Sequence, residues 1–269
     1  MVSRAGKYRA MDYPMYQVDA FTRERFHGNP AAVVISDDWL PDAVMLAVAA
    51  ENNLAETAFV VPAGKRFGIR WFTPTVEIDL CGHATLASAH VLLTHGYAQQ
   101  GPVEFAYGGG TLSVARDGER LVMDFPARPP ARSDAVREIG AAIGALPIET
   151  YRSNASMAVF ATEREVRALK PDMAAVEKIA GYGLIVTAPG DDCDFVSRFF
   201  APQSGVPEDP VTGSAHCTLI PYWSARLKKT RLHARQVSAR GGELWCEAAG
   251  DRVKMAGYAA SYLVGRISI

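Results

Sequence analysis

Two parts of this chain carry the same motifs in the same order, and this internal repeat constrains the fold more than any other feature. Residues 70–74 read Arg-Trp-Phe-Thr-Pro, and residues 198–202 read Arg-Phe-Phe-Ala-Pro. Downstream of each motif, an aspartate leads into a run of small residues that contains a glycine, Gly82 in the first copy and Gly213 in the second. Self-similarity of this kind indicates a duplicated structural unit.

Each copy predicts two strands, a loop with a proline, and a helix that begins at the glycine. The apolar runs 59–64 and 185–190 end in Pro and Gly residues and lead into the arginine motif, which is typical of strand, turn, strand. Residues 84–96 are mostly apolar and uncharged, as in a helix buried on nearly all sides.

The matching helix is expected over residues 215–227, but it contains a proline. Pro221 lacks a backbone donor, so we expect it to kink the helix or to end its first section near Leu219. Outer helices are expected at 42–52 and at 163–180, the second interrupted at Pro171. Strands are expected at 15–21, 31–35, 104–107, 111–115, 121–125, 157–161, 243–248 and, in two pieces, 252–269.

The regular pattern lapses where prolines cluster, at residues 126–130. We therefore predict an α+β fold of two pseudo-symmetric domains, each a curved sheet or barrel around a central helix. The first domain is assigned to residues 15–125 and the second to residues 126–257. Residues 1–14 are expected to be an N-terminal extension, and residues 258–269 a C-terminal strand that returns to the first domain.

Composition excludes several classes of function. The 269 residues include 28 Lys and Arg against 29 Asp and Glu, so no broad electrostatic attraction to nucleic acid or anionic lipid is expected. The longest uncharged stretch, 80–103, contains three histidines and is too polar to span a membrane. The first 13 residues lack the apolar segment of a secretory signal, so a cytoplasmic location is expected. The four cysteines form no C-x-x-C pair and are expected to be reduced.

The paired helix starts suggest a binding site. The N-terminus of a buried helix carries unpaired N–H groups and a partial positive charge. If a pseudo-two-fold axis relates the halves, residues 82–83 and 213–214 face each other across the cleft and form a site for a small carboxylate. Either glycine alone would be read as an ordinary turn residue, but the pairing favours a site.

Glu56 precedes an apolar strand, where a carboxylate is costly unless it faces a cleft. By strand alternation it shares a face with Ala58. Aligning Phe59 with Ile185 places Tyr182 at the corresponding position of the second copy, so only one half carries an acid there. The pattern alone leaves open the alternative of a solvated glutamate at a strand end.

Six motifs occur together in this sequence. They are Val-Asp-Ala-Phe at 18–21, Gly-Asn-Pro-Ala at 28–31, Glu56, Cys-Gly-His-Ala-Thr at 81–85, Asp-Phe-Pro-Ala at 124–127 and Asp-Pro-Val-Thr-Gly-Ser-Ala at 209–215. In this combination the chain, from about Met15 onward, resembles the PhzF-like isomerases of phenazine biosynthesis. The resemblance implies a diaminopimelate-epimerase-like fold, a homodimer and no cofactor.

The resemblance also implies a reaction and its residues. In such isomerases a glutamate moves a proton between carbons of dihydro-3-hydroxyanthranilate, a cyclic amino acid, and Glu56 corresponds to that glutamate. The family's histidine and aspartate, which fit a substrate amino group, correspond to His83 and Asp209. The serine, which fits the carboxylate, corresponds to Ser214. The predicted site is therefore catalytic Glu56, His83, Asp209 and Ser214, with substrate-binding Gly82, Gly213 and Asn29.

Two other functions stay open. Related epimerases and proline racemases, as the resemblance implies, use two cysteines on opposite faces. Cys81 precedes Gly82, but Thr212 precedes Gly213, which disfavours a two-thiol racemase. Racemisation by a Glu56 and Cys81 pair remains the alternative, and a non-catalytic small-molecule binder is the third reading.

No metal site is predicted. Cys81 with His83, and His216 with Cys217, lack the usual ligand spacings. The glycines at 108–110 precede an alternating segment, which favours a hairpin turn over a phosphate loop. The expected partners are a small carboxylate and a second copy of the chain.

Overall fold

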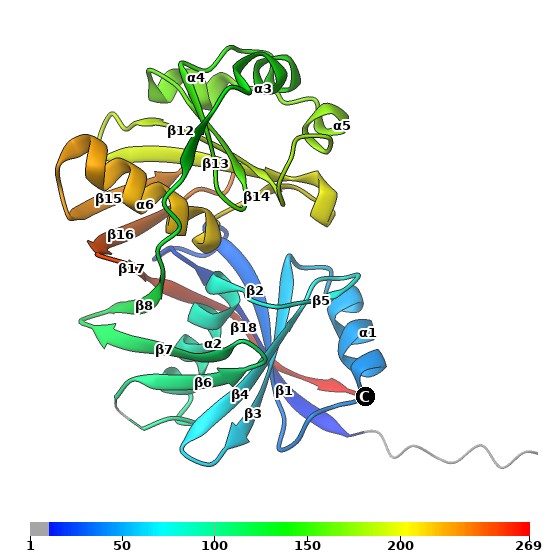
Figure 1. Cartoon of the computed structure of the whole chain (residues 1–269). Helices are drawn as coiled ribbons and strands as arrows, with labels where there is room; N and C mark the ends of the chain where they lie inside the picture. The colour runs from blue at the N-terminus through cyan, green and yellow to red at the C-terminus, as the bar shows by residue number, and fades with distance from the viewer. Residues whose placement is uncertain (1–10, 100) are drawn as a thin grey trace, which may run out of the picture.

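The computed structural model describes residues 11–99 and 101–269 and has two halves, each a strongly curved sheet around one helix (Figure 1). The first half contains β1 (Asp12–Ala20), β2 (Asn29–Ile35), α1 (Asp42–Asn52), β3 (Glu56–Ala63), β4 (Arg66–Phe72), β5 (Glu77–Ile78), α2 (Gly82–Thr94), β6 (Val103–Tyr107), β7 (Gly110–Asp117) and β8 (Arg120–Pro126).

The second half contains further strands and shorter helices. They are β9 (Ala131–Ser133), α3 (Val136–Ile143), β10 (Glu149–Arg152), β11 (Ser156–Val159), α4 (Glu163–Ala168), α5 (Met173–Val176), β12 (Leu184–Pro189), β13 (Phe195–Ala201), the 3-10 turn η1 (Pro202–Ser204), β14 (Val206–Asp209), α6 (Gly213–Leu227), β15 (Arg231–Gln236), β16 (Gly242–Ala249), β17 (Arg252–Gly257) and β18 (Ala259–Ser268).

The strand pairing repeats between the halves. In the first half β2 pairs with β3 and β4 with β6 in parallel, and in the second half β11 pairs with β12 and β13 with β15 in parallel. The hairpins β3–β4 and β12–β13 are antiparallel in both copies. This repeated topology confirms the predicted α+β class with two pseudo-symmetric halves.

The halves are joined by strands that cross between them. β8 pairs with β7 of its own half and with β17, and the chain after β8 supplies β9, which pairs with β10. In the same way, the chain after β17 supplies β18, which pairs with β1. The first half therefore contains β18, which comes after the second half in sequence, and the second half contains β9, which comes directly after the first half. These crossing strands fix how the two curved sheets lie relative to one another.

The main hydrophobic core surrounds the two central helices. Leu86 and Val91 of α2, and Leu219 and Trp223 of α6, are fully buried in one continuous cluster. Smaller clusters lie on the outer faces, under α1 in the first half and under α3, α4 and α5 in the second. Since both central helices lie within this core, packing of their helix bodies positions their N-termini.

Two local expectations differ from the structure. α6 does not end near Leu219, because it continues through Pro221 to Leu227. The missing proline donor would leave the carbonyl of Cys217 unpaired, but that oxygen accepts a hydrogen bond from the backbone N–H of Arg128 at 2.9 Å.

The predicted extension 1–14 also overlaps a strand. Residues 12–14 belong to β1, because the long strand β18 extends the pairing to Asp12. Residues 1–10 lie outside the described residues. None of the helices within the described ranges is both long and apolar enough to cross a membrane.

Candidate active site

The starts of the two central helices meet between the halves. α2 begins at Gly82 and α6 at Gly213, and a Cβ atom built on either glycine would lie 3.6 Å from the Cα of the other. Within these two fully described helices, neither N-terminus has a side-chain cap hydrogen bond or an acidic residue in its first turn. The predicted facing helix starts are therefore present, and their N–H groups are suited to an anion.

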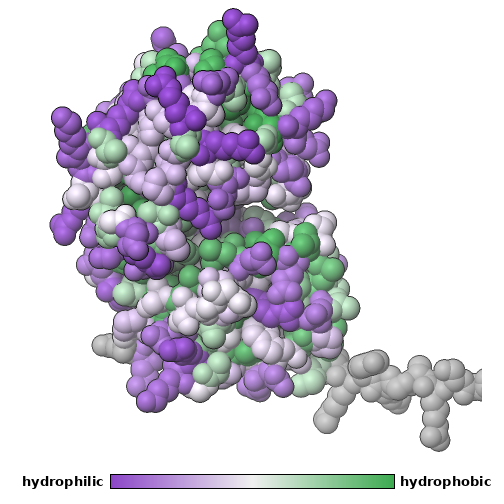
Figure 2. Space-filling model, in the orientation of Figure 1, coloured by the Kyte–Doolittle hydropathy of each residue, from purple (hydrophilic) through white to green (hydrophobic). Residues whose placement is uncertain are grey.

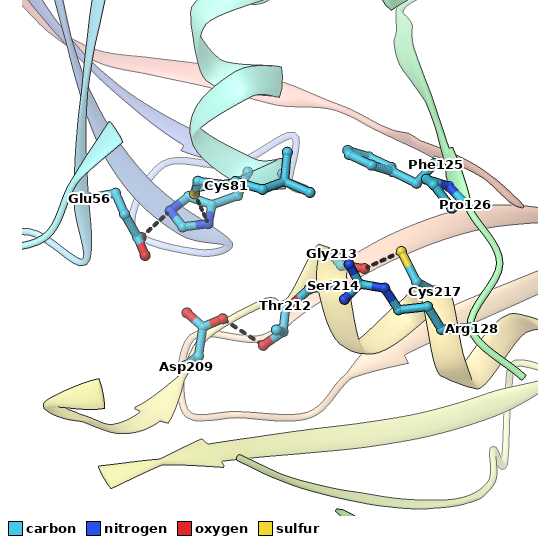
Figure 3. Close-up of a pocket in the computed structure, with 13 residues that line it drawn as sticks. Glu56, Cys81, Phe125, Pro126, Arg128, Asp209, Thr212, Gly213, Ser214 and Cys217 are labelled. Carbon is cyan, nitrogen blue, oxygen red and sulfur yellow. Dashed lines mark hydrogen bonds and ion pairs between the residues drawn. The ribbon is translucent and has the colours of Figure 1, made fainter. Parts of the chain in front are cut away.

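Glu56 and His83 lie beside these helix starts. Glu56 is the first residue of β3, and its side chain is only 14% exposed, which excludes a solvated strand end. Its Oε2 lies 3.0 Å from Nε2 of His83, the second residue of α2 (Figure 3). Neither atom has a well-aligned hydrogen-bond partner among the described residues. The carboxylate is thus held near the imidazole and keeps unused hydrogen-bonding capacity.

The charge state of His83 depends on its neighbours. Burial favours the neutral ring, but Cys81 and Glu56 outweigh it and hold the pKa of His83 well above its usual value. Burial, together with the charge of Glu56, raises the pKa of the Cys81 thiol. Glu56 therefore favours a hydrogen on Nε2 of His83, the ring nitrogen that faces it.

Asp209 faces the same space from the second half. Burial raises its pKa to about 6, although His83 and hydrogen bonds from Thr212 and Asn29 oppose this. Its Oδ1 accepts from Asn29 Nδ2 at 2.7 Å, and its Oδ2 accepts from Thr212 Oγ1 at 2.6 Å. Asp209 is thus oriented by two donors and changes charge near neutral pH.

Asn29 was predicted to bind substrate, and it lies behind the residues that line the cavity. The residue is fully buried, and its Nδ2 donates to Asp209 and to the backbone oxygen of Val211, with His83 Nδ1 at 3.2 Å. Its amide hydrogens are therefore occupied behind the cavity wall. Asn29, at the start of β2 in the first half, therefore positions Asp209 of the second half.

Gln236 on β15 is a positioning residue that sequence reasoning missed. Its Oε1 accepts from the backbone N–H of Thr212 at 2.8 Å, and its Nε2 donates to the carbonyl of Asp209 at 2.7 Å. These bonds fix the turn that presents Asp209 to the cavity. The contact spans 24 to 27 residues of sequence, so no local motif signals it.

Ser214 occupies the position in α6 that His83 occupies in α2. It is half-buried, and its Oγ accepts a hydrogen bond from the hydroxyl of Tyr182 at 3.0 Å. Burial raises the pKa of Tyr182, so the phenol remains a donor. Ser214 and Tyr182 together provide polar contacts from the second half.

The register of the strands corrects the predicted counterpart of Glu56. Phe59 pairs with the arginine of the first repeat motif, and Val186 pairs with the arginine of the second. Counting back three residues from each, the counterpart of Glu56 is Gly183, and the assignment to Tyr182 was wrong by one residue. The conclusion that one half alone carries an acid at this position is unchanged.

These groups line a cavity with two connected compartments. The inner one has a volume of about 80 Å³ and is lined by Glu56, His83, Asp209, Ser214, Gly82 and Gly213. The outer one, of about 490 Å³, shares Glu56, Asp209 and Ser214 with it. Figure 2 shows a hollow where the halves meet. The structure thus brings the predicted site residues together, with Asn29 behind them. It also places Arg128 at the cavity wall, a residue that the sequence assigned only to the proline-rich linker.

One cluster has metal-ligand residue types. Ligand atoms of Glu56, Cys81 and His83 lie within 4.8 Å of one another. However, Cys81 Sγ lies 3.5 Å from Nδ1 of His83, whereas Glu56 contacts Nε2 on the opposite side of the ring. An ion bound to either ring nitrogen would lie next to one flanking group and across the ring from the other, so this geometry favours proton chemistry over a three-ligand centre.

Several known proteins are similar to this chain in sequence or in structure. A family model described as phenazine biosynthesis-like protein, PhzC-PhzF, matches residues 18–265. An uncharacterized isomerase of Pseudomonas aeruginosa is 52% identical over 261 residues, covering 96% of this chain and 100% of the relative. A second one from that organism is 48% identical over 263 residues, with 96% and 100% covered. The crystal structure of a PhzF family protein from Enterococcus faecalis has a TM-score of 0.93 at 47% identity and covers 96% of this chain and 99% of that one.

Proposed function

Because the chain belongs to the PhzC-PhzF family of phenazine biosynthesis-like proteins, we propose that it is a cofactor-independent isomerase that moves a proton on a small cyclic amino-acid-like carboxylate. The observation that carries this proposal is that Glu56 lies at the cavity wall beside His83 and has no acidic counterpart in the other half, where Gly183 occupies the equivalent position. One base that both takes and returns a proton serves one face of a substrate, as a proton shift between carbons requires.

The arrangement supports a sequence of proton steps. Glu56 takes a proton from a substrate carbon, and His83, whose Nε2 lies 3.0 Å from the carboxylate, stabilises the charge of Glu56 between turnovers. Negative charge that develops on the substrate carboxylate is stabilised by the N–H groups at the starts of α2 and α6. Asp209 offsets the charge of a substrate amino group. Glu56 then returns the proton to a second carbon on the same face.

Racemisation is less well supported. The thiol that would pair with Glu56 in such a racemase, Cys81, lies on the other side of the His83 ring from Glu56, and burial raises the pKa of this thiol. The residue before Gly213 is Thr212, which is hydrogen-bonded to Asp209. These contacts favour one proton carrier.

Deuterium exchange tests the proposed function. The protein is incubated in deuterated water with cyclic and linear amino carboxylates, and the products are analysed by NMR. An isomerase incorporates label and shifts a double bond. Label with loss of optical purity would identify a racemase instead, and absence of both label and a shifted double bond across the panel would identify a binder.

The charge of Asp209 gives a prediction for pH dependence. Since its pKa is raised to about 6, activity should decline below about pH 6 as Asp209 is protonated. The Asn29 hydrogen bond favours the charged carboxylate, so Asn29→Ala should raise the pKa of Asp209 further and move this decline to higher pH. A 13C NMR titration of the Asp209 carboxyl group measures the shift directly.

The matched control is Asn52→Ala, because Asn52 bonds to Thr57 at 3.1 Å and does not contact Asp209. The titration of Asp209 should be the same in this variant as in the parent. Circular dichroism verifies that both variants are folded. A titration of Asp209 left unmoved, or moved to lower pH, by Asn29→Ala would contradict the positioning role.

A further inference from the structure

Arg128 lies in the segment between β8 and β9 and lines both compartments of the cavity. Its backbone is anchored on α6, because its N–H donates to the carbonyl of Cys217 at 2.9 Å. That carbonyl is available because Pro221 has no N–H to bond it. The segment therefore holds Arg128 beside the first turns of α6.

The guanidinium of Arg128 has no partner among the residues that the structure describes. It forms no ion pair and no side-chain hydrogen bond, although the residue is half-buried. Other half-buried arginines are paired: Arg198 with Glu208 at 2.7 Å and Arg240 with Asp19 at 2.7 Å. Since a partly desolvated cation is costly without an anion, the contrast points to an anion from outside the chain.

The acidic side chains around the cavity lie apart from its basic side chain. Glu56 and Asp209 lie on one side, and Glu77 and Asp79 line the outer compartment. Arg128 is the one arginine or lysine among the described residues that line either compartment. Figure 3 shows its guanidinium extending toward Ser214 and the start of α6. The positive end of the cavity is therefore formed by Arg128 and the two helix starts.

We propose that Arg128 binds the carboxylate of the substrate and is the residue that selects anionic over neutral ligands. The inference rests on the proposed function in taking this cavity as the substrate site. A guanidinium suits a carboxylate because it offers parallel N–H donors in one plane. With the carboxylate at this end, the amino group of the same ligand points toward Asp209 and a reacting carbon toward Glu56.

Calorimetry with matched ligand pairs tests the proposal. Anthranilate, L-proline and L-alanine are each titrated into the full chain and compared with their neutral amides. The parent should prefer at least one carboxylate over its amide, and Arg128→Gln should weaken binding of that carboxylate by about 10–100-fold with little effect on the amide. Arg128→Lys should restore part of the preference.

Arg132→Gln is the control variant, because Arg132 is exposed, carries the same charge and lines neither compartment. It should bind like the parent. Binding of the carboxylate to Arg128→Gln at parental strength would overturn the proposal, as would failure of all three carboxylates to bind the parent.

The calorimetry tests the role of Arg128 and the deuterium assay tests the reaction, so either proposal can be wrong while the other stands. If no label enters any ligand but Arg128→Gln removes the preference for carboxylates, the proposed reaction is wrong and the assignment of Arg128 stands. If label enters with Glu56 as the base while Arg128→Gln binds carboxylates normally, the reaction stands and the assignment is wrong.

Discussion

Replacing Glu56 with Gln is expected to slow proton transfer by about 10²- to 10⁴-fold while leaving the fold intact. Glutamine has nearly the same size, so the contact with His83 at the cavity wall is kept. Its amide cannot take a proton from carbon, however, and the counterpart position in the other half is Gly183, which offers no substitute base. The initial rate of deuterium incorporation, on a ligand that the parent labels, measures the effect.

Glu51→Gln is the matched control for this experiment. Glu51 is an exposed residue of α1, and it lines neither compartment of the cavity. This variant should exchange at the parental rate. A Glu56→Gln protein that labels its ligand as fast as the parent would remove Glu56 from the role of base.

Replacing Trp223 with Ala is expected to lower the free energy of unfolding by about 3–5 kcal/mol. Trp223 is fully buried on α6, and its ring is parallel to that of Phe195 at a centroid distance of 5.7 Å. Its Nε1 donates to Thr187 Oγ1 at 2.9 Å, so truncation also removes a buried hydrogen bond. Urea unfolding, followed by far-ultraviolet circular dichroism, measures the change.

Trp39→Ala provides the comparison, because it deletes the same side chain at a position that is 39% exposed. Its ring packs beside Gly68 at the surface of the first half, so a smaller loss is expected. Equal losses in the two variants would mean that α6 is not the packing centre of the second half.

Local patterns predicted the elements that depend on short-range chemistry. The helix expected at 42–52 is α1, and the glycines at 108–110 form the turn between β6 and β7, where Tyr107 pairs with Gly110. The expected break at Pro171 separates α4 from α5. By contrast, α3 was missed, as were the short strands β9 and β10.

The position of Glu56 shows what the alternation of side chains along a strand can predict. Ala58 and Val60, which share its face, belong to the core around the central helices, whereas Phe59 belongs to the outer cluster under α1. Strand geometry fixes which face a side chain takes, so this assignment followed from the sequence. What the side chain meets on that face depends on the other half.

The sequence by itself determined that the chain is duplicated, that two apolar helices begin at glycines, and that one acid stands on an inner face, because these properties follow from periodicity and residue type. Only the tertiary structure decided that Gly183 is the counterpart of Glu56 in the second half, that Asn29 lies behind the cavity, and that Arg128 lines it. Each depends on strand register or on contacts between segments far apart in the chain. Such contacts are selected by packing of the whole core, and local spacing carries no record of them.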